Sequence, residues 1–315
     1  MNHLITLDDL HDFDQLLKAM QAIQKNPLAH EQLGRHKTLG ILFFNPSLRT
    51  RISTQKAAQN LGMQCMVMNF NNEGWALEFE DDVIMNGTTS EHIKEAAGVL
   101  SQYFDVLAVR AFASLTDKAK DQAETVLRGF ARHSTIPIIN LESATAHPLQ
   151  ALADGLTITE FKKTTRPQVV LSWAPHPKAL PQAVANSFVR LMQRMDTDFV
   201  IAQPEGYELD SQLTKNMKVV YSQQEAFDGA DFIYTKNWSS FSHYGQVLRT
   251  DDAWKITSEK MKMTNNAYFM HCLPVRRNVV VDQAVLESPQ SLVLNQARNR
   301  TYAAQAVLKS ILDEA

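Results

Sequence analysis

Short apolar runs alternate with helix-forming runs along the chain, and this alternation restricts the possible folds more than any other sequence feature. Residues 39–44 are apolar, residues 52–61 are typical of a helix, and residues 65–70 are apolar again. A strand, a helix and a second strand in this order are the signature of a parallel sheet. The same alternation resumes after residue 167, so we predict two doubly wound α/β domains with parallel sheets.

The expected domain boundaries follow from the same pattern. The first domain comprises residues 1–147, completed by a C-terminal helix at 297–315 that packs back on it. The second domain comprises residues 148–296. We expect a helix from Pro148 to connect the two, because proline is favoured in the first turn of a helix.

Several single elements are predicted within these domains. Residues 7–25 and residues 118–133 are each expected to form one helix, because apolar side chains recur there at helical spacing. Residues 231–234 are expected to form a strand that is followed by a loop. Residues 71–90 are polar and rich in turn-forming residues, and a loop of that length is usually functional or lies at an interface.

Residues 45–51, with the sequence NPSLRTR, lie between the first predicted strand and its helix. Backbone amides at a helix N-terminus attract anions. Ser47 is placed to cap the helix, and Thr50 adds a second hydroxyl. Arg49 and Arg51 add two cations. This combination fits a group with several anionic oxygens, above all a phosphate; a capped helix with two solvated arginines is the alternative.

Further polar side chains fall at the ends of predicted strands, where open parallel sheets bind their ligands. They are Arg110, Glu142, His147, Gln150, His176, Lys236 and the segment 272–277. Because the carboxyl ends of strands meet at one edge of a sheet, we expect these residues to face a cleft shared by the two domains. Four candidate residues have a structural alternative: Arg110 as a surface residue, Trp75 as a loop anchor, His176 as a rigid-loop residue and Cys272 as a packing residue.

Composition excludes several functional classes. The net charge of −3 provides no general surface for nucleic acid or anionic membranes. No apolar run approaches the roughly 20 residues of a membrane span, and the acidic N-terminus does not resemble a signal peptide. Cys65 and Cys272 lie far apart, which fits a reducing cytoplasm. No metal cluster and no G-x-G-x-x-G turn is present, so we expect neither a metal nor another cofactor.

NPSLRTR, HPLQ at 147–150 and HCLP at 271–274 together resemble the aspartate/ornithine transcarbamylase family over essentially the whole chain. HCLP is similar to the ornithine branch. The Ser-Met-Gly loop and the aspartate that grip the free α-amino group of ornithine are missing, and the corresponding loop reads TKNWSSFSHYG. Instead, the chain resembles the transcarbamylases of N-acylated ornithine, in the segments EGWALEFE, WAPHPKALPQAV, PEGYELD and HCLPVRRNV. An acylated α-nitrogen is a neutral amide, so it offers no positive charge for an acidic side chain to bind. A cation such as Lys236 or Arg276 is suited instead to a carboxylate.

The resemblance implies a role for individual residues. Carbamoyl phosphate would be bound by Ser47, Leu48, Arg49, Thr50, Trp75, Arg110, His147, Gln150, Cys272, Leu273 and Arg300. Of these, Thr50, Arg110, His147 and Cys272 would lie at the reacting atoms. The acylated ornithine would be bound by Glu142, His176, Lys236, Arg276 and Ser90. The resemblance also implies a homotrimer in which Trp75 reaches a neighbouring subunit's site, and a knotted second domain.

The acyl group is predicted from one position. In the family branch that the chain resembles, acetyl-type members have a glutamate and succinyl-type members a proline where this chain has Ser90. Serine lacks the charge that would repel a succinyl carboxylate. We therefore predict carbamoyl transfer to N-succinyl-L-ornithine, giving N-succinyl-L-citrulline and phosphate in arginine biosynthesis. Glu91 keeps N-acetyl-L-ornithine as the alternative acceptor, and a catalytically silent binding subunit is the alternative of a different class.

Overall fold

The computed structural model describes residues 3–314, which form two compact units. Unit 1 contains the described residues up to Ser114, Ala119–Leu149 and the residues from Arg300 onward, and unit 2 contains Leu115–Lys118 and Gln150–Asn299. Each unit is built on one five-stranded parallel sheet, which confirms the predicted pair of α/β domains. The boundaries predicted at residues 147 and 297, and the knot, stay predictions.

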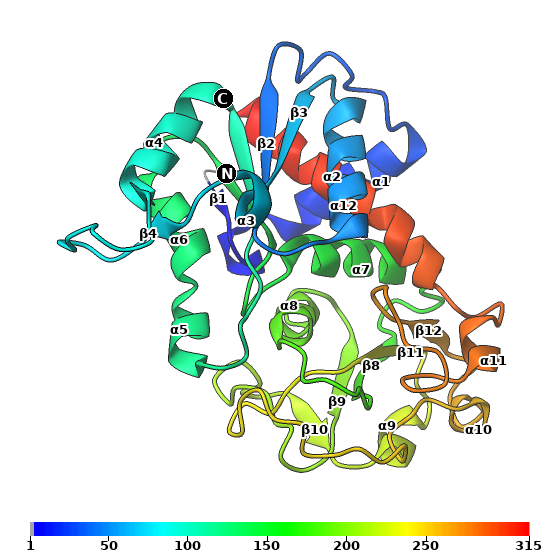
Figure 1. The fold of residues 1–315 in the computed structure, drawn as a ribbon. Coiled ribbons are helices and arrows are strands. Elements are labelled where there is room, and N and C mark those ends of the chain that lie inside the picture. Colours follow the sequence, from blue (N-terminus) through cyan, green and yellow to red (C-terminus); the bar gives the residue numbers. More distant parts are fainter. Residues whose placement is uncertain (1–2, 315) are drawn as a thin grey trace. The chain divides into compact units, whose positions relative to one another are not determined.

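The unit 1 sheet has the strand order β1-β7-β6-β2-β3, with every neighbouring pair parallel. Its strands are β1 (His3–Leu4), β2 (Thr38–Phe43), β3 (Gln64–Asn69), β6 (Val106–Arg110) and β7 (Ile138–Glu142). Figure 1 shows α4 (Ile93–Tyr103) and α6 (Thr125–His133) on one side of these strands. Their apolar side chains form a core with the sheet that includes Leu42, Leu107 and Phe130.

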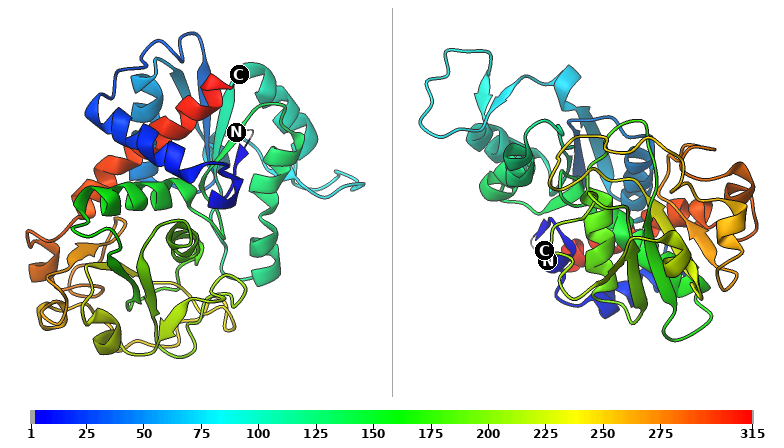
Figure 2. Two further views of the ribbon diagram at one scale, coloured as in Figure 1. Left: turned by 180° about the vertical axis from the view of Figure 1, so that it is seen from behind. Right: turned by 90° about the horizontal axis from the view of Figure 1, so that it is seen from below.

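Three longer helices lie on the other side of the unit 1 sheet. They are α1 (Phe13–Lys25), α2 (Leu48–Asn60) and the part of α12 (Val293–Asp313) that follows Asn299. The two views of Figure 2 show α1 and α12 side by side. Asn60 on α2 donates a hydrogen bond to Gln305 on α12 at 2.9 Å, and Gln305 donates in turn to the Pro27 carbonyl at 2.6 Å. Side-chain hydrogen bonds therefore tie the end of the chain to unit 1.

Short elements complete unit 1. They are η1 (Leu7–Asp9), α3 (Phe70–Glu73), β4 (Leu77–Glu78), β5 (Glu91–His92) and α5 (Lys118–Ala123), whose first residue belongs to unit 2. The strand β4 lies within the long polar segment predicted at 71–90, β5 directly follows that segment, and the two strands pair in parallel. That segment is therefore held at its base by a small sheet.

The unit 2 sheet has the strand order β10-β9-β8-β11-β12, again parallel throughout. Its strands are β8 (Gln168–Trp173), β9 (Asp198–Ala202), β10 (Lys218–Val220), β11 (Phe232–Lys236) and β12 (Tyr268–Met270). The helices of this unit are α7 (Pro148–Phe161), α8 (Ala183–Met192), α9 (Gln223–Phe227), α10 (Ser258–Met261) and α11 (Gln283–Leu286), with α7 beginning two residues inside unit 1. Aromatic side chains fill much of the core: Phe188 stacks on Tyr234 at 4.2 Å between ring centroids, and the Trp173 indole donates to the Trp238 carbonyl.

Three predicted elements were wrong in extent. Residues 7–25 form η1 and α1 instead of one helix, because the Asp12 side chain caps a new helix by accepting from the Gln15 amide at 2.8 Å. Residues 118–133 form α5 and α6, because Glu124 has a left-handed backbone conformation with φ of 49° that interrupts the helix. Lys236 lies in strand β11, not in the loop after it, because its backbone continues the pairing with Trp173 of β8.

The close packing of unit 1 gives a testable prediction at Gly40, in the middle of β2. A Cβ atom there would lie 2.7 Å from the side chains of both Leu107 and Phe104, which are themselves buried. We expect Gly40→Ala to lower the free energy of unfolding by about 1–3 kcal/mol through overpacking. Urea unfolding followed by circular dichroism measures this change.

Gly98 on α4 provides the matched control, because a Cβ atom there would meet nothing within 4 Å. We expect Gly98→Ala to raise the free energy of unfolding by about 0.5–1 kcal/mol, since alanine loses less backbone entropy in a helix. Equal effects of the two substitutions would contradict the packing argument.

Candidate active site

Five polar side chains form a chain of contacts in unit 1. Arg110 at the end of β6 donates a hydrogen bond to Glu142 at the end of β7. The Glu142 carboxylate lies 3.6 Å from Nε2 of His147, and the same ring nitrogen lies 3.4 Å from Nη1 of Arg300. Arg300 Nη2 donates to the Thr50 hydroxyl at 2.7 Å. Residues from five separate segments thus meet at the carboxyl edge of one sheet.

Burial strengthens the electrostatics of this group, which we call the Arg300 network (Thr50, Arg110, Glu142, His147 and Arg300). Thr50, Arg110, His147 and Arg300 are all buried. A guanidinium remains charged at every physiological pH and only donates hydrogen bonds. Two such groups together with a single carboxylate in the network leave an excess of positive charge, which suits an anionic ligand.

The first turn of α2 brings Ser47 and Thr50 to the same edge of the sheet. Ser47 is the N-cap residue, but its side chain makes no capping hydrogen bond, so the predicted cap was wrong in this respect. The Thr50 hydroxyl is turned to Arg300 instead. Leu48 is 67% exposed, and Arg51 lies over the Phe43 ring at 5.9 Å. The helix N-terminus, with its amides and its partial positive charge, remains a site suited to a phosphate.

Trp75 and Ser90 lie beside each other at the base of the long polar loop. The Trp75 indole donates to the Glu91 carboxylate at 2.9 Å, and the Ser90 amide donates to the Ala76 carbonyl at 2.9 Å. Trp75 is nevertheless 58% exposed. Its side chain is therefore no buried anchor of the loop, which removes the structural alternative for this residue.

A second chain of hydrogen bonds lies in unit 2. Gln150 on α7 donates to Asp154, one helical turn later, at 2.7 Å. Gln296 on α12 donates to the same Asp154 oxygen at 2.8 Å and accepts from the backbone amide of His271 at 2.9 Å. Asp154 therefore holds both Gln150 and the segment that carries Cys272 and Leu273.

Two titratable side chains at the HCLP segment, His271 and Tyr234, remain uncharged. Burial, followed by the positive charge of Lys236, lowers the pKa of His271 to about 3. Its Nδ1 contacts the Cys272 carbonyl at 2.5 Å, so that nitrogen must carry the proton of the neutral ring. Burial, followed by the charge of Asp154, raises the pKa of Tyr234 well above its ordinary value. His271 and Tyr234, which lie beside Cys272, are thus both neutral at physiological pH.

A cation cluster surrounds His176 in unit 2. Arg276 Nε donates to His176 Nε2 at 3.0 Å, and His176 Nδ1 contacts the Lys178 carbonyl at 2.8 Å. Burial lowers the pKa of His176, and the nearby charges of Lys236, Arg276 and Lys178 lower it further. A neutral histidine with three cations around it is suited to bind carboxylates.

The structure therefore brings many of the predicted residues together in two groups, one in each unit, whereas Trp75 and Ser90 lie apart at the base of the polar loop. It places Glu142 with Arg110 and His147, and Gln150 with the residues of unit 2. Sequence reasoning missed Asp154, Gln296 and Tyr234. Asp154 could have been found from the sequence, because it lies four residues after Gln150 and therefore on the same face of the predicted helix. Gln296 and Tyr234 are distant in sequence from Asp154, so no sequence pattern indicated them.

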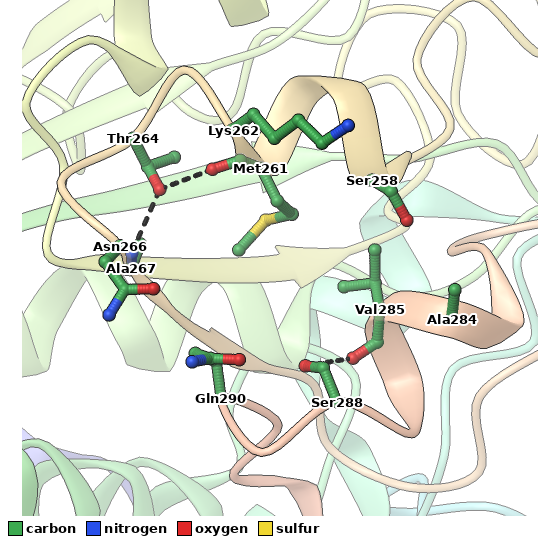
Figure 3. A pocket seen from close by; sticks show the side chains of 10 residues that line it. All are labelled: Ser258, Met261, Lys262, Thr264, Asn266, Ala267, Ala284, Val285, Ser288 and Gln290. Atoms are coloured by element: carbon green, nitrogen blue, oxygen red, sulfur yellow. Dashed lines mark hydrogen bonds between the residues drawn. The ribbon is translucent and has the colours of Figure 1, made fainter.

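A separate cavity of about 360 Å³ lies in unit 2 between α10 and α11 (Figure 3). Asn266 and Ala267, which line it, come directly before β12, so the cavity lies at the amino edge of the sheet. Ligands of open parallel sheets bind at the opposite, carboxyl edge. Among residues 3–314 no cluster of His, Cys, Asp and Glu is arranged to hold a metal ion, and no helix is long and apolar enough to cross a membrane.

Comparison with known proteins places both units in one family. The carbamoyl-phosphate-binding domain of aspartate/ornithine carbamoyltransferase matches residues 2–160, and the Asp/Orn-binding domain of the same proteins matches residues 181–311. The chain belongs to the aspartate/ornithine carbamoyltransferase family. The family assignment made from NPSLRTR, HPLQ and HCLP is thereby confirmed.

Relatives within the carbamoyltransferase family differ in similarity. The chain is 50% identical over 315 residues to an N-succinylornithine carbamoyltransferase of Bacteroides thetaiotaomicron, covering 99% of both chains. It is 35% identical to an N-acetylornithine carbamoyltransferase of Xanthomonas axonopodis pv. citri, covering 100% of this chain and 98% of the relative. A solved N-acetyl-L-ornithine transcarbamylase with one glutamate replaced by serine, complexed with carbamyl phosphate and N-succinyl-L-norvaline, superposes with a TM-score of 0.91 at 34% identity, covering 99% of this chain and 100% of that one.

The cation cluster predicts a change in the titration of His176. Lys236→Gln removes one positive charge near the imidazole, which makes the protonated ring less unfavourable. We expect the pKa of His176 to rise but to stay below its ordinary value, because burial is the larger cause of its depression. NMR titration of the His176 ring proton measures this change.

Lys162→Gln is the matched control, since Lys162 is an exposed lysine of the same unit whose ammonium contacts the Thr165 carbonyl. The pKa of His176 should not change in this variant. A His176 pKa that stays constant or falls in Lys236→Gln would contradict the charge assignment.

Proposed function

We propose that the protein transfers the carbamoyl group of carbamoyl phosphate to the δ-amino group of N-succinyl-L-ornithine, giving N-succinyl-L-citrulline and phosphate. The reaction serves arginine biosynthesis in the cytoplasm. The observation that carries the choice of acceptor is the cation cluster of unit 2, taken together with the 50% identity to an N-succinylornithine carbamoyltransferase.

Unit 1 binds carbamoyl phosphate in this proposal. The amides at the start of α2, together with Ser47, Arg49 and Thr50, hold the phosphate, and Arg300 completes its surroundings. Arg110 and His147 meet the carbamoyl group. The family resemblance also assigns Gln150, Cys272 and Leu273, which belong to unit 2, to carbamoyl phosphate. The excess positive charge of the Arg300 network supports this assignment, because carbamoyl phosphate is a dianion at neutral pH.

Unit 2 binds the acceptor. N-succinylornithine has two carboxylates, one on the α-carbon and one at the end of the succinyl group, whereas N-acetylornithine has one. Lys236 and Arg276 both lie near the neutral His176, and Lys178 adds a third charge. Three cations are more readily balanced by two carboxylates than by one. We propose that the Glu142 carboxylate contacts the δ-amine of the acceptor. A position beside the succinyl carboxylate would place two negative charges together.

The chemistry follows from the charges that change during transfer. The δ-amine has a solution pKa of about 10.4 and must be neutral to attack, which costs about 4 kcal/mol near pH 7.5. Its nitrogen forms a bond with the carbamoyl carbon as the bond from that carbon to the phosphate oxygen breaks. Arg110, His147 and Thr50 stabilise the charge that develops on the carbamoyl oxygen, each contributing on the order of 10²–10³ in rate. The departing phosphate takes the amine proton.

Acceptor choice is tested by steady-state kinetics with carbamoyl phosphate and ornithine, N-acetylornithine or N-succinylornithine. We expect the highest kcat/KM for N-succinylornithine. A higher value for N-acetylornithine would reverse the choice of acceptor. Absence of turnover with every acceptor would favour a silent binding subunit.

Ser90→Glu tests the residue to which the acyl preference is assigned. A carboxylate at this position should lower kcat/KM for N-succinylornithine by about tenfold or more through like-charge repulsion, and leave N-acetylornithine almost unaffected. Ser90→Gln has the same size without the charge and should affect the two acceptors equally. The serine-substituted relative bound to N-succinyl-L-norvaline supports this expectation.

We also propose a homotrimer with active sites shared between subunits. The exposed side of α2 supports it, because Leu48 and Ile52 are 67% and 57% exposed while the buried side of the same helix has small or polar residues. Trp75 is also exposed, on the loop that follows α3. Apolar side chains exposed on one helix and one loop indicate a protein–protein contact.

Shared sites predict that two inactive variants restore each other. Trp75→Ala and Arg300→Ala should each be nearly inactive alone. In a trimer that contains both, a site can combine intact Arg300 from one subunit with intact Trp75 from another, so a 1:1 mixture should recover about a quarter of wild-type activity. Light scattering measures the oligomeric state. A mixture as inactive as its components would exclude shared sites.

A further inference from the structure

Glu124 makes a set of buried contacts that the proposed reaction does not use. It lies between α5 and α6, is 6% exposed and has φ of 49° and ψ of 42°. This left-handed conformation is uncommon for residues with a side chain and persists only where surrounding contacts enforce it. Although Glu124 is the N-cap residue of α6, its side chain makes no capping bond. The carboxylate points to another part of unit 1.

Its partners are the residues of the turn between β7 and α7. One carboxylate oxygen, Oε1, accepts hydrogen bonds from the Thr145 amide at 2.9 Å, the Thr145 hydroxyl at 2.7 Å and the Ser143 hydroxyl at 2.5 Å. Ser143 also closes the turn, because its amide donates to the Ala146 carbonyl at 2.8 Å. Asn140 on β7 donates to the Ser143 hydroxyl at 3.0 Å. A negative charge accepting three hydrogen bonds fixes this turn more firmly than neutral partners would.

The turn connects two members of the Arg300 network. Glu142 comes immediately before it and His147 immediately after it. The position of the His147 imidazole between Glu142 and Arg300 therefore depends on the path of four intervening residues. Contacts of this kind matter for catalysis because a displacement of about 1 Å at a reacting group can cost about 100-fold in rate.

We propose that Glu124 is a positioning residue, which holds the turn 143–146 so that His147 meets the carbamoyl group in the correct orientation. The kinetic part of this inference rests on the proposed carbamoyl transfer. The left-handed backbone of Glu124 directs its carboxylate into the turn, and the carboxylate fixes the turn through three hydrogen bonds.

Two substitutions separate the carboxylate from the backbone conformation. Glu124→Gly accepts a positive φ without strain but has no carboxylate, so we expect kcat to fall about 100-fold, together with a lower Tm because buried donors of the turn lose their acceptor. Glu124→Gln keeps an acceptor oxygen without the charge, and we expect a smaller fall of about tenfold. If Glu124 were needed only for its backbone conformation, Glu124→Gly would keep wild-type kcat.

A double-mutant cycle tests whether Glu124 acts through His147. In a His147→Ala background, Glu124→Gly should change the residual kcat and the carbamoyl phosphate Kd by no more than about twofold. Asp105→Asn is the control for structural damage. Asp105 braces the amino edge of the same sheet by accepting from the Thr38 amide at 2.7 Å. Asp105→Asn should lower Tm without changing kcat or KM.

The ring resonances of His147 give a readout that requires no ligand. They should shift in Glu124→Gly, whereas those of His176 in unit 2 should not. If the wild-type protein neither bound carbamoyl phosphate nor turned over any acceptor, the proposed function would fail, and the His147 resonances would decide the present inference alone. The inference is overturned if the His147 resonances are unchanged in Glu124→Gly, or if this variant retains kcat within about twofold of wild type. It is also overturned if Glu124→Gly lowers kcat by the same factor in the His147→Ala background as in the wild-type protein.

Discussion

Two buried guanidinium groups set the constraint on which the candidate-site half of unit 1 depends. Arg110 and Arg300 cannot lose their charge, and a charge removed from water is tolerated only with close partners. Glu142 is the partner of Arg110, while Thr50 and His147 lie against Arg300. The ends of two strands and the starts of two helices must therefore keep their places if the fold is to tolerate these charges. The same arrangement concentrates positive charge at one point, so the contacts that the fold requires also create surroundings suited to an anion.

Much of the fold was predictable because each unit repeats one simple pattern. Buried parallel strands such as β2 and β8 are continuous apolar runs, and the helices between them show the spacing of apolar residues that packs one face on a sheet. The candidate site was predictable for a related reason. Carboxyl ends of parallel strands gather at one edge, so Arg110 and Glu142 were expected to be near each other from their positions in the sequence alone.

The contacts between irregular segments were not predictable in the same way. The break at Glu124 involves neither glycine nor proline, and the carboxylate reaches a turn about twenty residues later, so no periodic signal marks it. Gln296 likewise meets Asp154 across 142 positions of the chain. Such pairs are fixed by the packing of complete elements, which a single sequence does not reveal. The Ser47 cap failed for a subtler reason, since the sequence identifies the N-cap residue but not the direction in which its hydroxyl points.

Two of the boundaries between the units fall within long helices. Leu149 and Gln150 are consecutive residues of α7, and Asn299 and Arg300 are consecutive residues of α12. A chimaera that exchanged the acceptor-binding half for that of a relative would have its junctions inside helical turns, where a change of register by one residue rotates every following side chain by about 100°. Recombination at these points must preserve helix phase, so acceptor preference in this protein is more accessible to point substitution than to exchange of domains.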